Sequence, residues 1–97
     1  ELGEVEAALR QAAKTESIVA LGWPIVGTGV AGIVAFVSDT ALSAEAIQAS
    51  LRTLLPRYMV PKRLVLLAQM PRNINGKCDR KALADQLRRK VVEEDLS

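Results

Sequence analysis

The residues with the clearest capacity for chemistry lie in a polar loop near the carboxyl end of the chain, residues 71–83. The loop contains Asn75-Gly76, which predicts a turn because both residue types tolerate positive φ. Lys77 follows directly, so the turn presents an ammonium group at the loop tip. This group is a mobile point charge suited to neutralising a phosphate or carboxylate oxygen. From spacing alone, the alternative is an ordinary lysine that faces solvent in a turn.

Two glycine patterns resemble phosphate-binding motifs in sequence, but neither meets the requirements of such a motif. Residues 27–32 read Gly-Thr-Gly-Val-Ala-Gly, but residues 33–37 after them predict a strand, whereas a dinucleotide site requires a helix there. The Gly-Lys pair of the polar loop has Pro71 and Cys78 where a P-loop needs a glycine and a Ser or Thr. We therefore predict a mobile connection without a bound nucleotide at residues 27–32, and we exclude a P-loop.

The composition is that of one small domain with an aliphatic core. The chain has 97 residues, of which 49% are hydrophobic and 25% charged, which excludes a disordered or collagen-like chain. Its single cysteine and its lack of histidine leave no internal disulfide and no zinc cluster. With no apolar run near the ~20 residues of a membrane span, and no signal peptide, the expectation is a soluble, cytoplasmic protein. A first residue other than Met suggests a fragment or a processed product.

Charge is distributed unevenly along the chain. Residues 1–56 carry three basic and six acidic side chains, a net charge of −3, and residues 57–97 carry ten basic and five acidic ones, a net charge of +5. A basic half favours anionic partners. One hypothesis outside enzymology is therefore a small basic module that binds nucleic acid or an acidic protein. Tyr58 is the only aromatic residue in this half, which disfavours base stacking on single-stranded nucleic acid.

Hydrophobic periodicity predicts an α+β domain, a small three-stranded sheet flanked by helices in the order α-β-β-α-β-α. Ser43 and Asp79 stand where they can cap the second and third helices. Residues 91–97 are predicted to form a flexible tail. The predicted helices span residues 2–14, 44–55 and 80–90, and the predicted strands span residues 17–21, 33–37 and 63–67.

Three motifs, in the right order and spacing, resemble those of the adenylate-forming enzymes. Residues 75–83 read Asn-Gly-Lys-Cys-Asp-Arg-Lys-Ala-Leu and, preceded by Pro71, resemble the last core motif of that superfamily. Residues 55–61 read Leu-Pro-Arg-Tyr-Met-Val-Pro and resemble the family's Leu-Pro-x-Tyr-Met-x-Pro segment before the third strand. Residues 1–6 read Glu-Leu-Gly-Glu-Val-Glu and resemble the end of the hinge motif. The resemblance identifies residues 1–97 as the small C-terminal lid subdomain. The large N-terminal subdomain, with the ATP-binding loops and acyl pocket, lies outside these residues.

The resemblance implies two half-reactions. A carboxylate attacks the α-phosphate of ATP to give an acyl-adenylate, and the lid then rotates so that a phosphopantetheine or CoA thiol takes the acyl group. Lys77 matches the family's catalytic lysine of the first step, and Asn75 and Gly76 lie beside it in the loop near ATP. Gly3 matches the edge of the segment that approaches the thiol. ATP with Mg2+ would be bound mainly by the large subdomain, and this chain would contribute no metal ligands.

The motifs lean toward the amino-acid adenylation domains of nonribosomal peptide synthetases, and hence toward antibiotic biosynthesis. Arg57, Lys62 and Arg63 are then expected to form a basic face for an acyl or peptidyl carrier protein. The alternative is the lid of an acyl- or aryl-CoA ligase. Residues 18–24 and the glycine-rich stretch replace the charged hairpin usual in the family, which leaves room for a stand-alone ligase. Without a large subdomain, the isolated chain is predicted to be inactive.

The remaining motif residues are expected to have structural roles. Pro56, Tyr58 and Pro61 would fix the corner between the second helix and the third strand. Cys78, where the family often has Val or Ile, would be a half-buried apolar residue. Arg80 would be a charge on the surface or at a subdomain contact.

Overall fold

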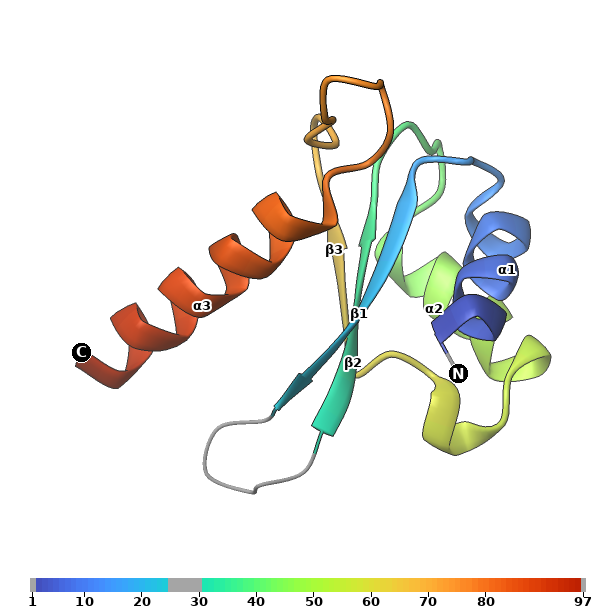
Figure 1. Ribbon diagram of the computed structural model, residues 1–97. Coiled ribbons are helices and arrows are strands. Elements are labelled where there is room, and N and C mark those ends of the chain that lie inside the picture. Colours follow the sequence, from blue (N-terminus) through green and yellow to red (C-terminus); the bar gives the residue numbers. More distant parts are fainter. Residues whose placement is uncertain (1, 25–30, 97) are drawn as a thin grey trace.

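A three-stranded sheet with β2 in its middle organises the fold (Figure 1). The computed structural model describes residues 2–24 and 31–96. The order predicted from the sequence is confirmed, with one short 3-10 helix, η1, in addition. The elements are α1 (Leu2–Ala13), β1 (Ile18–Pro24), β2 (Ala31–Val37), α2 (Ala44–Leu54), η1 (Arg57–Met59), β3 (Arg63–Leu66) and α3 (Arg80–Leu96).

The strands pair in two different directions. β1 is antiparallel to β2, with Ile18 opposite Val37, and β3 is parallel to β2, with Val34 opposite Arg63. Two parallel strands that follow each other in the sequence require a crossover connection, and α2 lies within this one. The sheet is thus a β1–β2 antiparallel pair extended by one parallel edge strand.

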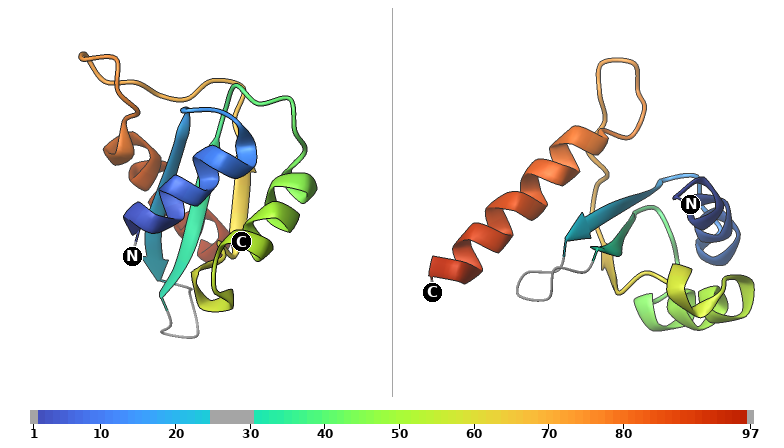
Figure 2. Two further views of the ribbon diagram at one scale, coloured as in Figure 1. Left: turned by 90° about the vertical axis from the view of Figure 1, so that its right-hand side faces the viewer. Right: turned by 60° about the horizontal axis from the view of Figure 1, so that its bottom comes forward.

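Helices cover both faces of the sheet, which explains the continuous apolar strands of the sequence. α1 and α2 lie on one face and α3 lies on the other (Figures 1 and 2). Successive side chains of a strand point to opposite faces. Ile18 and Ala20 accordingly pack with α1 and α2, and Val19 packs with Leu83 of α3. Strands buried on both faces need apolar residues at every position.

Both predicted helix caps are confirmed. The Ser43 hydroxyl accepts a hydrogen bond of 3.1 Å from the N–H of Ala46 at the start of α2. The Asp79 carboxylate accepts one of 3.1 Å from the N–H of Ala82 in the first turn of α3. An N-cap of this kind satisfies a backbone donor that has no partner within the helix.

Several predicted boundaries were wrong. Gly32, expected in the glycine-rich connection, lies in β2 opposite Trp23, because strand pairing continues past the apolar run. The rest of that connection lies outside the described residues. α3 ends at Leu96 instead of about residue 90, since no glycine or proline interrupts it. The backbone of residues 91–96 is therefore helical, and the flexibility expected for residues 91–97 stays a prediction. Among the described helices, none has the length and apolarity required to cross a membrane.

Candidate functional site

Lys77 lies in a short hairpin that links β3 to α3. The hairpin is closed by an antiparallel bridge between Arg72 and Cys78. Within it, the N–H of Gly76 donates to the carbonyl of Asn73 at 2.9 Å, and the N–H of Asn73 donates to the carbonyl of Lys77 at 2.8 Å. The predicted turn is present, and Gly76 adopts the positive φ of +79° that a glycine tolerates without strain.

Asn73 organises the turn of this hairpin, and the sequence analysis did not single it out. Its side-chain oxygen accepts hydrogen bonds from the N–H groups of Asn75 at 2.9 Å and Lys77 at 3.1 Å. Asn commonly organises a turn by binding backbone groups two residues ahead, so the spacing of Asn73 and Asn75 was an available signal. The side chain of Asn73 thereby fixes the backbone from which the Lys77 side chain projects.

The hairpin has almost no apolar packing of its own. Residues 72–77 are all exposed, and Ile74 at the tip is 99% exposed. Among the described residues, no acidic side chain forms an ion pair with Lys77. Cys78, by contrast, is half-buried and packs against the core between the sheet and α3, as the sequence predicted. The hairpin thus presents the ammonium of Lys77 to solvent, and only the base of the hairpin contacts the hydrophobic core.

Arg72 ties one end of the hairpin to the sheet. Its guanidinium donates to the hydroxyl of Ser17 at 2.6 Å and to the carbonyl of Gly76 at 3.2 Å. The Ser17 hydroxyl in turn donates to the carboxylate of Asp39 at 3.0 Å, and Arg72 lies 3.9 Å from the same carboxylate. Ser17 precedes β1 and Asp39 follows β2, so the contact joins the hairpin to the ends of two strands.

Arg80 ties the other end to α1. Its guanidinium donates to the carboxylate of Glu6 at 2.7 Å, and the N–H of Ala20 donates to the same carboxylate at 2.9 Å. Burial by itself would raise the pKa of Glu6, but the hydrogen bonds from Arg80 and Ala20 and the nearby charges of Arg80 and Arg10 lower the pKa below its usual value. Arg80 was expected as a charge on the surface or at a subdomain contact. Its side chain is half exposed, and it also forms this ion pair across the fold.

The structure brings some predicted site residues together and separates others. Asn75, Gly76 and Lys77 share the hairpin, beside an open groove lined in part by Arg10 and Glu16. Gly3 lies in the first turn of α1, and the amino end of this helix is far from the hairpin (Figures 1 and 2). Gly3 therefore forms no common site with Lys77 within this chain.

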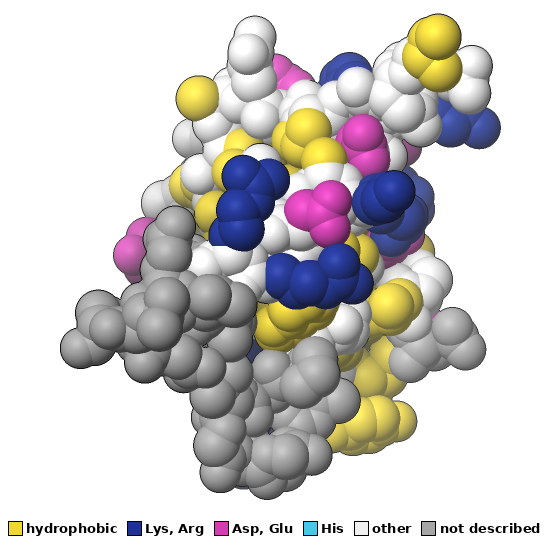
Figure 3. Space-filling model, turned by 60° about the vertical axis from the view of Figure 1, so that its left-hand side comes forward, with side chains coloured by type: hydrophobic (Ala, Val, Ile, Leu, Met, Phe, Trp, Pro, Cys, Tyr) yellow, Lys and Arg dark blue, Asp and Glu magenta, His cyan; other side chains and the backbone are white. Residues whose placement is uncertain are grey.

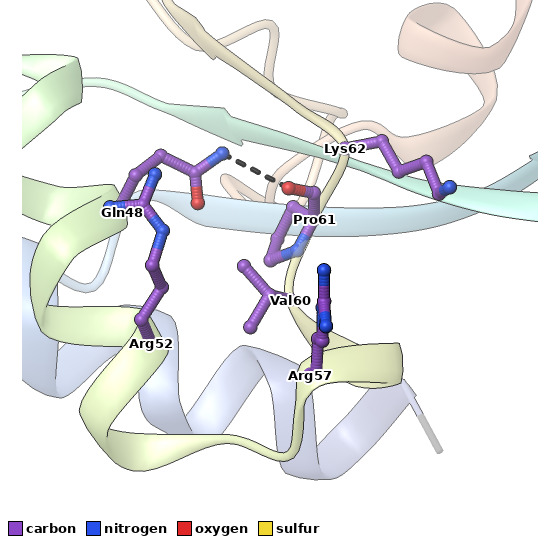
Figure 4. A pocket seen from close by; sticks show the side chains of 6 residues that line it. All are labelled: Gln48, Arg52, Arg57, Val60, Pro61 and Lys62. Atoms are coloured by element: carbon purple, nitrogen blue, oxygen red, sulfur yellow. Dashed lines mark hydrogen bonds between the residues drawn. The ribbon is translucent and has the colours of Figure 1, made fainter.

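A second cluster of basic residues lies where α2, η1 and β3 meet (Figure 4). Arg57 and Lys62 line this pocket together with Arg52, which the sequence analysis missed. Arg63 is exposed but is not among the residues that line it. Gln48 holds the corner, since its amide donates to the carbonyl of Pro61 at 3.0 Å. Two of the three residues of the predicted basic face therefore line one pocket, and the role of this face stays a prediction.

The corner itself depends on two of the three predicted residues. Pro56 precedes η1 and Pro61 is buried before β3. Tyr58 is 83% exposed, so it does not hold the corner by packing, contrary to the prediction. The reason is the 3-10 turn, which directs Met59 into the core and leaves Tyr58 outside.

Positive charge is not continuous over the face on which α3 lies. Lys and Arg side chains alternate there with Asp and Glu side chains and with hydrophobic ones (Figure 3). Arg88 is an example of this mixture. Its guanidinium forms an ion pair with Asp85 at 3.1 Å and lies over the Trp23 ring, 5.8 Å from the ring centre. A nucleic-acid interface is typically a clustered basic stripe, and this face does not carry one among its described residues.

The fold and the hairpin together define a class of protein, a small α+β subdomain that carries an exposed lysine on an anchored turn. Residues 4–77 match the family described as the AMP-binding enzyme C-terminal domain. The chain belongs to this family and is a C-terminal subdomain of the adenylate-forming ligases.

Relatives and solved structures agree with this assignment. Nonribosomal peptide synthetase 5 of Aspergillus fumigatus is 40% identical over 88 residues, which cover 91% of this chain and 4% of that protein. The adenylation domain AlmE of Vibrio cholerae, solved in complex with glycyl-adenosine-5'-phosphate, superposes with a TM-score of 0.70 at 35% identity over 90% of this chain and 16% of that one. A fatty acyl CoA synthetase of Mycobacterium tuberculosis gives a TM-score of 0.73 at 26% identity over 86% of this chain and 17% of that one. The chain therefore spans a small part of the proteins it matches.

Proposed function

We propose that this chain is the mobile lid of an ATP-dependent ligase that activates an amino acid or another carboxylic acid as its adenylate. The observation that carries the proposal is the exposed Lys77 on a hairpin whose backbone is fixed by Asn73. Family membership supports the proposal, and the resemblance of residues 75–83 to the last core motif of the family is the reason to assign Lys77 as its catalytic lysine. The large subdomain that binds ATP and the acid is a separate part of the working enzyme.

The chemistry assigned to Lys77 is electrostatic. Adenylate formation brings a carboxylate against the α-phosphate of ATP, and two anions repel each other. A cation placed between them offsets the repulsion as charge develops in the transition state. A lid that delivers this cation also excludes water from an adenylate that water would hydrolyse. Asn75 and Gly76 shape the loop near ATP but carry no charge for the reaction.

ATP and Mg2+ are assigned mainly to the large subdomain. The described part of this chain contains no group of three or more acidic, cysteine or histidine side chains arranged for a metal ion. Its contribution to the nucleotide site is therefore the Lys77 ammonium, whose charge complements a phosphate oxygen.

The second half-reaction is assigned to the same lid in another orientation, in which Gly3 and its neighbours approach the acceptor thiol. The similarity to nonribosomal peptide synthetases favours the phosphopantetheine of a carrier protein as the acceptor. The basic pocket of Arg52, Arg57 and Lys62 then suits the acidic surface of such a carrier. The similarity to a fatty acyl CoA synthetase supports the alternative, in which CoA is the acceptor.

Separate assays of the two half-reactions test the role of Lys77 in the complete enzyme. Lys77→Ala is expected to slow adenylation by about 100- to 1,000-fold, the effect of losing one electrostatic donor, and to spare transfer from a preformed adenylate. Lys77→Arg is expected to restore only part of the rate, because a planar fork does not replace a point charge. Lys81→Ala, an exposed lysine in the first turn of α3, is the matched control. Equal slowing of both half-reactions by Lys77→Ala would contradict the proposal.

The acceptor is tested by reversing charge in the basic pocket. Arg52→Glu and Arg57→Glu are expected to weaken transfer to a holo carrier protein and to leave transfer to free pantetheine unchanged. A loss with both acceptors would argue against a docking role for this pocket. The 97-residue chain alone is expected to show no carboxylate-dependent exchange of pyrophosphate into ATP.

A further inference from the structure

The hairpin that carries Lys77 is anchored at both ends by arginines. Arg72 lies five residues before Lys77 and Arg80 lies three residues after it. Each guanidinium binds a group that is far away in the sequence. Arg72 reaches Ser17, 55 positions away, and Arg80 reaches Glu6, 74 positions away.

The groups that receive these arginines are themselves held in place. The Glu6 carboxylate is bound by the N–H of Ala20 in β1 at 2.9 Å, and Glu6 is only 7% exposed. Arg80 also lies 3.5 Å from the carbonyl of Ala20, so one residue of the sheet contacts both partners of the ion pair. The acceptor of Arg80 is thus part of the rigid interface between α1 and β1.

The acceptor of Arg72 is fixed in a comparable way. Ser17 and Ser38 both donate hydroxyl hydrogen bonds to the carboxylate of Asp39, at 3.0 and 3.1 Å. Ser38 is 1% exposed, and its backbone N–H bonds the carbonyl of Ser17 at 3.0 Å. These bonds hold the adjoining ends of β1 and β2 together at the point where Arg72 docks.

Apolar contacts do not explain the position of the hairpin. Ile74 is its one large hydrophobic side chain and is 99% exposed. The bonds of Asn73 stay within the hairpin and fix its internal shape but not its direction. Beyond the packing of Cys78 at the base of the hairpin, the side-chain hydrogen bonds of the two arginines join its ends to the sheet and to α1.

We propose that Arg72 and Arg80 are positioning residues, which hold the hairpin at both ends so that the lid delivers the Lys77 ammonium in one orientation. The proposal rests on the proposed role of Lys77 in adenylation. A catalytic charge acts fully only at the correct place, and a displacement of about 1 Å can cost on the order of 100-fold in rate. Each guanidinium donates to two different groups, Arg72 to Ser17 and Gly76 and Arg80 to Glu6 and Ala20. The planar geometry of the guanidinium fixes the directions of these bonds and so provides the required orientation.

A double-mutant cycle in the complete enzyme separates this role from general stabilisation. Arg72→Lys and Arg80→Lys keep the charge but remove the fork, and each is expected to slow adenylation by about tenfold or more. In a Lys77→Ala background the same substitutions are expected to cause no further loss, because there is no ammonium left to misplace. Transfer from a preformed adenylate is expected to be unchanged throughout. Arg88→Lys, which alters an ion pair on the surface of α3, is the control.

The possible outcomes distinguish this inference from the proposed function. Equal losses in the presence and absence of the Lys77 side chain would overturn the positioning role and leave the role of Lys77 intact. No loss on Lys77→Ala alone would overturn the proposed function itself.

A measurement on the 97-residue chain tests the positioning role without any activity. Backbone order parameters at Asn75 and Lys77 are expected to fall from about 0.85 to below about 0.6 in Arg72→Lys. Those of the three strands are expected to stay constant, which also reports that the variant is folded. Unchanged order in the hairpin would overturn the inference.

Discussion

We predict that substitutions of Glu6, which forms an ion pair with Arg80, lower the free energy of unfolding by amounts that depend on which hydrogen bonds are lost. Two substitutions of Glu6 remove different parts of its contacts. Glu6→Ala removes both hydrogen bonds of the carboxylate, those from Ala20 at 2.9 Å and Arg80 at 2.7 Å. Glu6→Gln keeps an oxygen for the N–H of Ala20 but removes both the charge and the acceptor that face Arg80.

The magnitudes follow from burial. Ala20 is 0% exposed, so its N–H without an acceptor costs about 1–3 kcal/mol. The Arg80 side chain is 53% exposed, so solvent screening limits the loss of the ion pair to about 0.5–1 kcal/mol. The expected decrease in the free energy of unfolding is therefore about 1.5–4 kcal/mol for Glu6→Ala and about 0.5–1 kcal/mol for Glu6→Gln.

Urea unfolding of the chain near pH 7 and near pH 3 is the assay. The pKa of Glu6 in the folded state lies below its usual value of 4.5, so the folded state favours the ionised carboxylate. The resulting stabilisation is present above the unfolded pKa and is lost as the pH falls through the folded pKa. The difference between the unmodified chain and Glu6→Gln is therefore expected to shrink toward pH 3.

Two results would refute this reasoning. Equal losses for Glu6→Ala and Glu6→Gln near pH 7 would mean that the bond to Ala20 contributes nothing. A difference between the unmodified chain and Glu6→Gln that stays constant with pH would mean that the ion pair does not stabilise the fold. Glu4→Gln, at an exposed position of the same helix, controls for a general effect of charge on α1.

Three further predictions concern the glycines and the cysteine. Gly76→Ala is expected to cost about 1–2 kcal/mol of unfolding free energy in urea unfolding, because φ is +79° there. In the same assay Gly22→Ala is expected to cost nothing, since the new Cβ has nothing within 4 Å and φ is not positive. Cys78→Val is expected to leave adenylation and stability close to their original values, since the side chain packs as a half-buried apolar group, and loss of activity would point to a reactive thiol. Replacing Gly29 and Gly32 by Ala is expected to leave the affinity of the complete enzyme for ATP unchanged, because Gly32 lies within β2 and the glycines lead into a strand instead of a helix. A loss of about tenfold in a folded variant would reveal a phosphate site.

Local patterns in the sequence predicted most of the fold. Ser43 and Asp79 cap helices by bonds to residues three positions ahead, so the sequence around them contains the whole interaction. The turn at Gly76 is local in the same sense. The apolar runs predicted all three strands because helices cover both faces of the sheet. The boundaries were less predictable, since pairing extends β1 and β2 by a few residues beyond their apolar cores.

The anchors of the hairpin could not be predicted in this way. Glu6 and Arg80 meet because α1 and the start of α3 approach the same strand, and no periodicity of either segment contains that information. The one available signal was an acidic residue beside the apolar stripe of the first helix, where Glu6 adjoins Val5 and Leu9. The contacts of Arg72 were still harder to predict, since its partners Ser17 and Asp39 lie in connections between elements.

The polar nature of these anchors bears on the lid role that we propose for this chain. A hairpin of so few residues has no room for an apolar core, and a large exposed apolar patch would bind unspecifically when the lid is open. Charge-assisted bonds from a guanidinium fork fix direction without adding apolar surface. If Arg72 and Arg80 position the hairpin as proposed, Lys77 depends on side chains far away in the sequence, since Arg72 binds Ser17 and Arg80 binds Glu6. Substitutions at these two partners are therefore expected to reach the chemistry through the orientation of the hairpin, although neither side chain contacts the lysine.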